Sequence, residues 1–156
     1  MTSLGPDVPR VVAPPPVIYL TALVLGVLLD RWIPLWRLSP PVFRIVGWPV
    51  LGGGVVLLSW FVLTMRRAGT PINPRYPASR LVTDGPFAYT RNPGYLALTL
   101  IYGGLASLAN ALWALLLLPL VLWLLRRSVI DPEERYLERR FRSEYRNYKA
   151  RTRRWI

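Results

Sequence analysis

Residues 92–125 read NPGYLALTLIYGGLASLANALWALLLLPLVLWLL, a stretch without a single charged side chain. A helix needs about 20 residues to cross a bilayer, so this stretch is too long for one span and short for two. Residues 107–110, Ser-Leu-Ala-Asn, lie near its middle and are of types that favour turns. The stretch therefore predicts two short helices, at about 93–108 and 111–127, that form a hairpin in the membrane.

Two glycines and one asparagine bear on this hairpin. Gly103 and Gly104 lack side chains and would let the partner helix approach closely. The alternative to a hairpin is one long tilted helix. That helix would place Asn110 in lipid or in a packed interior, which costs free energy.

Two more apolar segments precede the hairpin, at about 14–30 and 44–65. Each is long enough, or nearly so, to span a bilayer. The chain has 156 residues, 53% of them hydrophobic, which leaves room for one domain. The sequence therefore predicts an all-α integral membrane protein, a single domain over residues 1–156 with about four transmembrane helices.

Basic residues are distributed unevenly between the two ends of these spans. With four spans, both termini and the loop at 66–92 share one side. Apart from the basic C-terminal tail, that side holds Arg10, Arg66, Arg67, Arg75, Arg80, Arg91, Arg126 and Arg127. The other side has only Arg31, Arg37 and Arg44. Because cytoplasmic loops carry an excess of Lys and Arg, both termini are predicted to be cytoplasmic. An aromatic belt on the other side is predicted from Trp32, Trp36 and Trp48.

The sequence contains no cysteine and no histidine, and its formal net charge is +12 at pH 7. Without these residues there is no thiolate or imidazole to bind a metal or to act as a nucleophile, and no metal site is predicted. Arginine-rich ends beside apolar spans attract anionic lipid headgroups, so we expect the membrane surface as a partner and no nucleic acid. Nothing in the sequence indicates the oligomeric state.

The C-terminal part of the chain is polar and predicts an amphipathic helix at 131–150 on the cytoplasmic face. Asp131 suits the N-cap, Pro132 the first helical position, and Glu134 completes a capping-box pattern. Aromatic and apolar residues then recur at helical spacing: Tyr136, Leu137, Phe141, Tyr145 and Tyr148. Such a helix lies along the membrane interface or packs beneath the bundle. Glu133 and Glu134 have an ordinary explanation as first-turn acids, which the helix dipole favours.

The loop at 66–92 ends on Arg91-Asn92-Pro93, which is a favourable helix start. Asn suits the N-cap and Pro the first helical position. The free N–H groups of the helix that follows, together with Arg91, form a ready site for a carboxylate or a phosphate. The simpler explanation is that Asn92 only caps the helix and that Arg91 extends to lipid headgroups.

Four motifs stand in order along the second half of the chain. They are Thr70-Pro-Ile-Asn-Pro74, Leu81-Val-Thr-Asp-Gly-Pro-Phe87, Arg91-Asn-Pro-Gly-Tyr95 and the run from Glu133 to Tyr148. Together they resemble the isoprenylcysteine carboxyl methyltransferase family and the related phospholipid N-methyltransferases. The resemblance covers about residues 66–154. It implies a membrane-embedded S-adenosylmethionine-dependent methyltransferase that acts on a lipid-borne or hydrophobic acceptor at the cytoplasmic face.

Carried over residue by residue, the resemblance implies cofactor contacts from Ser79, Arg80, Leu81, Val82, Phe87, Asn92, Pro93, Gly94, Tyr95 and Glu133. Among the candidate catalytic residues, Arg91 is suited to the carboxylate of the cofactor and Glu133 to its cationic part. If the acceptor is an amine, the candidates that remove its proton are Glu133, Glu134 and Tyr95. Position 129 is Val where the isoprenylcysteine enzymes have a carboxylate-binding Arg, which argues against an isoprenylcysteine carboxylate as the acceptor.

Two other functions fit parts of the sequence. Membrane NADPH-dependent reductases of the sterol type have a similar Arg-x-Pro-x-Tyr element and a similar C-terminal helix, but they are usually longer. A non-catalytic scaffold whose basic tail binds anionic lipids is the other alternative. Binding of S-adenosylhomocysteine or of NADPH separates the three.

Overall fold

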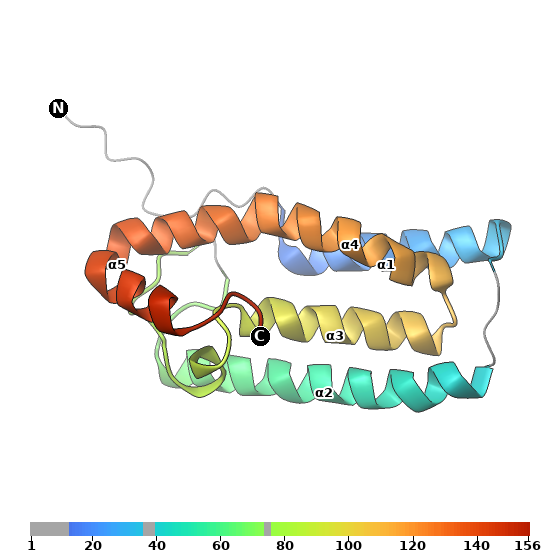
Figure 1. The fold of residues 1–156 in the computed structure, drawn as a ribbon, viewed down its shortest axis with the longest axis horizontal. Coiled ribbons are helices and arrows are strands. Elements are labelled where there is room, and N and C mark those ends of the chain that lie inside the picture. Colours follow the sequence, from blue (N-terminus) through green and yellow to red (C-terminus); the bar gives the residue numbers. More distant parts are fainter. Residues whose placement is uncertain (1–12, 36–39, 74–75) are drawn as a thin grey trace.

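The charge-free stretch forms two antiparallel helices (Figure 1). The computed structural model describes residues 13–35, 40–73 and 76–156. Helix α3 spans Pro93–Leu108 and helix α4 spans Leu112–Leu125. Between them Asn110 has a φ of 52°, a left-handed conformation that Asn tolerates better than most residues. The chain therefore forms a helical hairpin here and not one long helix.

Three further α-helices occur in the described residues. Helix α1 spans Pro15–Trp32, α2 spans Pro40–Arg67 and α5 spans Asp131–Arg151. The loop between α2 and α3 contains one 3₁₀ turn, Gly85–Ala88. No strand occurs in the part of the chain that the structure describes, and the predicted all-α fold is confirmed.

Most of the helices have the length and composition of membrane spans. Pro15–Trp32, Val42–Arg67 and the continuous helix Leu112–Arg151 are long and apolar enough to cross a bilayer, and α3 is a shorter apolar helix. Large apolar side chains are exposed on them, among them Leu20, Val56, Leu116 and Trp123. A helix that is apolar on its outer face is stable in lipid and not in water. The chain is accordingly an integral membrane protein.

Part of the predicted aromatic belt and part of the predicted arginine asymmetry lie outside the described residues. Of the predicted aromatic belt, Trp32 and Trp48 have exposed side chains, whereas Trp36 lies outside the described residues. Three of the arginines on which the predicted orientation depends also lie outside the described residues: Arg10, Arg37 and Arg75.

Two pairs of helices approach each other closely at a glycine. A Cβ atom on Gly104 of α3 would lie 2.6 Å from the backbone nitrogen of Leu51 in α2. A Cβ on Gly26 of α1 would lie 2.4 Å from Cα of Ala114 in α4. The prediction that both Gly103 and Gly104 face a closely packed partner is wrong for Gly103, which has no atom within 4 Å of an added Cβ. The helix that approaches Gly104 is α2 and not the other arm of the hairpin.

Helix α5 continues directly from α4. The predicted capping box at Asp131 instead required a new helix to begin there. The link is one π-helical turn, Arg126–Ile130. Asp131 has helical angles (φ −63°, ψ −40°), and no side-chain capping bond is made at this junction. Pro132 lacks an N–H group and its ring crowds the carbonyl one turn earlier, and a widened turn just before it accommodates both effects without ending the helix.

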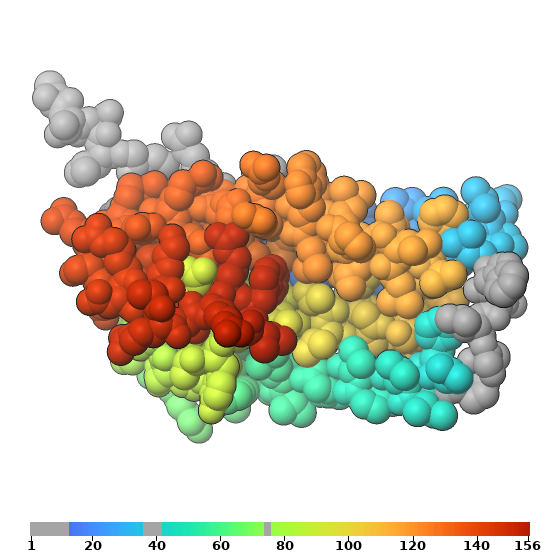
Figure 2. Space-filling view, viewed as in Figure 1, coloured from blue at the N-terminus to red at the C-terminus, as the bar shows by residue number. Residues whose placement is uncertain are grey.

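Near its end α5 turns back toward the bundle. Arg142 has non-helical angles (φ 42°, ψ −112°), and a kink lies at this position. Beyond the kink Tyr145 and Tyr148 are buried. The C-terminal segment then covers the start of α3, where the N–H of Arg91 donates to the carbonyl of Arg153 at 2.9 Å (Figure 2, red). Beyond the kink, α5 and the C-terminal segment therefore pack against the loop before α3 and the start of α3.

Candidate functional site

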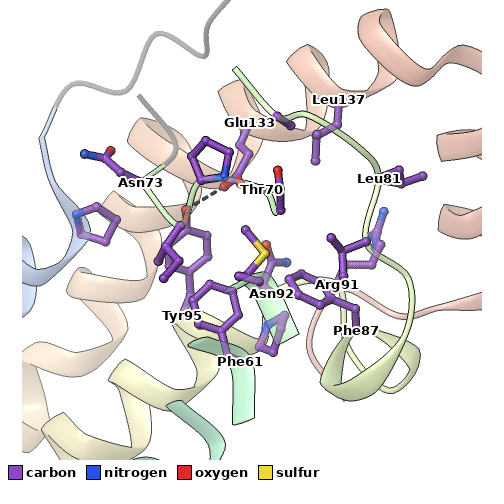
Figure 3. A pocket seen from close by; sticks show the side chains of 18 of the residues that line it. Phe61, Thr70, Asn73, Leu81, Phe87, Arg91, Asn92, Tyr95, Glu133 and Leu137 are labelled. Atoms are coloured by element: carbon purple, nitrogen blue, oxygen red, sulfur yellow. Dashed lines mark hydrogen bonds between the residues drawn. The ribbon is translucent and has the colours of Figure 1, made fainter. Parts of the chain in front are cut away.

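A cavity of about 520 Å³ lies where α2, α3, α5 and the loop before α3 meet (Figure 3). Its polar side is lined by Arg91, Asn92, Tyr95, Glu133 and Glu134. Its apolar side is lined by Leu58, Phe61 and Met65 of α2 and Leu98 of α3, with Pro14–Pro16 at the start of α1. Small-molecule sites commonly have volumes of roughly 300–1,000 Å³, so the cavity is large enough for a ligand of nucleoside size.

The start of α3 is part of the cavity wall. Pro93 is the first helical residue and Asn92 occupies the N-cap position, as predicted, but the Asn92 side chain makes no capping bond. Its Nδ2 instead donates to the carbonyl of Arg154 at 2.9 Å. The first regular bond of the helix runs from the N–H of Leu96 to the carbonyl of Asn92, at 3.0 Å. The N–H groups of Gly94 and Tyr95 therefore have no acceptor within the helix.

Arg91 is buried beside this helix start. Its side chain is 10% exposed, and its Nη2 lies 3.6 Å from Oε1 of Glu134. Its Nε and Nη1 have no hydrogen-bond partner within the described ranges. A guanidinium in this position does not extend to lipid headgroups, so the simpler explanation given for Arg91 does not hold. Buried donors without acceptors are costly, and an anionic ligand would satisfy them.

Glu133 and Tyr95 are in direct contact in the wall of the cavity. The phenol of Tyr95 donates to Oε2 of Glu133 at 2.6 Å (Figure 3). Burial raises the pKa of the Glu133 carboxyl above its usual value. The hydrogen bond from Tyr95 opposes this shift, and the negative charge of Glu134 adds to it. A carboxylate with a raised pKa accepts a proton more readily than an exposed one, as a general base requires.

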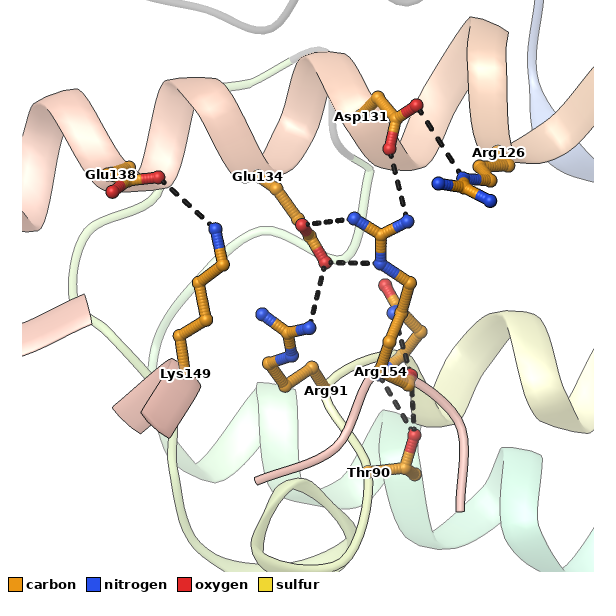
Figure 4. A network of polar contacts seen from close by, with 9 residues as sticks. Thr90, Arg91, Arg126, Asp131, Glu134, Glu138, Lys149 and Arg154 are labelled. Atoms are coloured by element: carbon orange, nitrogen blue, oxygen red, sulfur yellow. Dashed lines mark hydrogen bonds and ion pairs between the residues drawn. The ribbon is translucent and has the colours of Figure 1, made fainter. Parts of the chain in front are cut away.

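Glu134 is held in a network of ion pairs (Figure 4). Its two oxygens accept from Nε and Nη2 of Arg154 at 3.0 and 2.7 Å. Nη1 of the same arginine lies 3.3 Å from Oδ1 of Asp131. The first-turn explanation given for Glu133 and Glu134 is therefore insufficient, because Glu134 pairs with two arginines and the helix continues into α5 from the preceding turn.

Two tyrosines of α5 form hydrogen bonds with the backbone of the loop before α3. The hydroxyl of Tyr136 accepts from the N–H of Ala78 at 3.1 Å, and that of Tyr148 donates to the carbonyl of Phe87 at 2.7 Å. Burial raises the pKa of Tyr145 and Tyr148, and the nearby charge of Arg91 opposes this shift. Both phenols are therefore neutral at physiological pH, and they serve as packing and hydrogen-bonding groups.

Most of the residues predicted for the site line one cavity. The following predicted residues do so: Arg80, Leu81, Val82, Phe87, Arg91, Asn92, Pro93, Gly94, Tyr95, Glu133 and Glu134. Ser79 is not part of the lining; its N–H donates to Oγ1 of Thr70 at 3.1 Å.

Sequence analysis missed other lining residues, above all Phe61 and Met65 at the end of α2. They have the same composition as a lipid-facing surface, so no pattern in the sequence marked them. Tyr136 and Leu137 had a signal, since they lie three and four residues after Glu133 and share its helix face.

Comparison with models of known protein families gives one match. The family model described as phospholipid methyltransferase matches residues 42–144, from α2 into α5. No curated protein and no solved structure matches the chain. The matched region contains α3, Glu133 and the whole loop between α2 and α3 with Arg91, which together form most of the cavity wall.

Proposed function

Because the chain belongs to the phospholipid methyltransferase family, we propose that it transfers a methyl group from S-adenosylmethionine to a lipid-borne acceptor at the cytoplasmic face. The family supports a membrane methyltransferase with a lipid substrate. The observation that carries the finer proposal is the cavity itself. It has buried cationic donors at Arg91, a carboxylate at Glu133, and an apolar side formed by membrane helices.

The polar residues fit two charged groups of S-adenosylmethionine, its carboxylate and its sulfonium. Arg91 has two buried nitrogens that lack acceptors among the described residues, and they suit the carboxylate of the methionine part. The free N–H groups at the start of α3 add to this anion site. Glu133 suits the cationic part. When bound, the cofactor supplies a methyl group on a sulfonium, so the protein mainly positions the two reactants.

The apolar side of the cavity supports an acceptor with a hydrocarbon chain. Leu58, Phe61 and Met65 come from α2, which is exposed to lipid elsewhere, and they lie on the same cavity as Glu133. An acceptor headgroup that enters from the membrane would meet the Tyr95–Glu133 pair. Since Glu133 is a carboxylate with a raised pKa, we propose an amine acceptor whose proton passes to the carboxylate of Glu133 as the methyl group moves from the sulfonium to the nitrogen.

The arrangement in the membrane follows from the charges. We propose four passes with both termini in the cytoplasm, because Arg66, Arg67, Arg126 and Arg127 lie at the cavity end of the spans. The exposed arginines at this end suit anionic headgroups. The cavity would then open toward the cytoplasmic leaflet, where S-adenosylmethionine is available.

The detergent-solubilised protein is expected to bind S-adenosylhomocysteine with a Kd below about 1 mM, and to bind NADPH weakly or not at all. Asn92→Ala should weaken this binding, because it removes a side chain that lines the cavity and ties Arg154 to the start of α3. Isothermal titration calorimetry gives both affinities.

The matched control for that experiment is Asn147→Ala, which truncates an exposed side chain of α5 outside the cavity. Absence of S-adenosylhomocysteine binding, or preferential binding of NADPH, would rule out the proposed function. Equal affinities for wild type and Asn92→Ala would show that the site is assigned to the wrong residues.

Lowering the pH is expected to remove the preference of the protein for S-adenosylmethionine over S-adenosylhomocysteine. Only the first ligand carries the sulfonium charge, which an ionised Glu133 favours. Because burial raises the pKa of Glu133, its carboxylate takes up a proton at a higher pH than an ordinary glutamate. The preference is therefore present above that raised pKa and is lost as the pH falls through it.

The measurement is the ratio of the two Kd values from neutral pH downward. In Glu133→Gln the ratio should not depend on pH, since an amide does not titrate. A wild-type ratio that stays constant until the usual pKa of glutamate, about 4.3, contradicts the role given to Glu133.

A further inference from the structure

Arg154 pairs with acidic residues of α5 but does not line the cavity. Its side chain donates to both oxygens of Glu134, and its Nη1 pairs with Asp131 (Figure 4). Its backbone carbonyl accepts from Nδ2 of Asn92 at 2.9 Å and from Oγ1 of Thr90 at 3.1 Å. One residue of the C-terminal segment thus contacts both α5 and the approach to α3.

Two arginines compete for Glu134. Arg154 holds it in the bidentate geometry that is among the strongest between these groups, with a shortest contact of 2.7 Å. The contact of Arg91 with the same carboxylate is 3.6 Å, longer than a normal hydrogen bond. Arg154 therefore compensates most of the charge of Glu134. Arg91 keeps its positive charge and its two buried donors beside the cavity.

We propose that Arg154 is a positioning residue that holds Glu134 away from Arg91 and thereby keeps Arg91 available for the carboxylate of a ligand in the cavity. The proposal rests on the proposed function, because it takes the amino-acid end of the cofactor as that ligand. Without Arg154, Arg91 still contacts Glu134. A movement of under about 1 Å would close the contact between Nη2 of Arg91 and Oε1 of Glu134 to the usual ~2.8 Å. The charge of Arg91 would then be paired with Glu134, and its guanidinium would be drawn toward that carboxylate instead of toward the ligand.

The test compares two ligands, S-adenosylhomocysteine and 5′-methylthioadenosine, which keeps the nucleoside and the thioether but lacks the amino-acid carboxylate. Arg154→Ala is expected to weaken S-adenosylhomocysteine binding about tenfold, the usual size for one charge-assisted contact. Binding of 5′-methylthioadenosine should change little. Adding Glu134→Gln to Arg154→Ala should restore most of the lost affinity, because the amide has no charge with which to hold Arg91.

Two further variants make this test specific. Arg153→Ala removes the same charge one residue earlier, from an exposed side chain, and should leave both affinities unchanged. Arg154→Lys keeps the charge but loses the planar fork, so its selectivity for S-adenosylhomocysteine should lie between those of the wild type and Arg154→Ala.

Several outcomes would overturn the proposal. Equal losses for the two ligands in Arg154→Ala would indicate a merely structural role. An unchanged affinity for S-adenosylhomocysteine in that variant, or a double variant no better than the single one, would also overturn it. If the wild-type protein binds neither ligand, the proposed function fails and this inference with it, which distinguishes the two kinds of failure.

Discussion

Glu133→Gln is expected to lower the rate of methyl transfer by a factor of about 10²–10⁴, the range associated with loss of a general base. The carboxylate of Glu133 lies in the cavity within 2.6 Å of the phenol of Tyr95, and its raised pKa suits it to take a proton from an acceptor amine. Glutamine has the same shape, and its amide oxygen can still accept from Tyr95. Binding of S-adenosylhomocysteine should therefore change much less than the rate.

The rate is measured as transfer of a labelled methyl group from S-adenosylmethionine to membrane lipid extracts. The matched control is Glu138→Gln, which neutralises a glutamate of the same helix outside the cavity, where it pairs with Lys149 at 3.5 Å. The control should retain the wild-type rate. An undiminished rate in Glu133→Gln would show that the acceptor does not give its proton to this residue.

Local patterns in the sequence were sufficient to predict the hairpin and the start of α3. The charge-free stretch had the wrong length for one span, and Asn92-Pro93 is a strong helix start. The partner of the Asn92 side chain could not be predicted in this way, because it is the carbonyl of Arg154, which is far away in the sequence. Local rules also placed a helix start at Asp131, whereas a π-helical turn carries the helix past Pro132.

Only the polar part of the candidate site could be predicted from local sequence patterns. Its polar residues belong to motifs with distinctive composition, such as Arg91-Asn92-Pro93 and Glu133-Glu134. Its apolar wall does not, since Phe61 and Met65 look like any other residues of a membrane span until the packing of α2 is known. The grouping of Glu134 with Arg154 likewise depends on the kink at Arg142, which returns the C-terminal segment to the cavity.

Gly104→Ala is expected to destabilise the protein by at least about 2–3 kcal/mol, the upper part of the usual range for overpacking. The new methyl group would lie 2.6 Å from the backbone nitrogen of Leu51 and 2.8 Å from its Cα. Backbone atoms cannot move aside as a flexible side chain can, so α2 and α3 must separate. Because both helices contribute to the cavity wall, S-adenosylhomocysteine binding should fall together with stability.

Gly103→Ala is the matched control, since it adds the same methyl group one residue earlier, where no atom lies within 4 Å. There the substitution should be neutral or stabilising, because Ala is favoured over Gly inside a helix by roughly 0.5–1 kcal/mol. Thermal unfolding in detergent distinguishes the two, with Gly104→Ala expected to lower Tm by about 5–10 °C. Equal Tm values for the two variants would mean that α2 and α3 do not pack through Gly104, and that the cavity wall they form is wrongly placed.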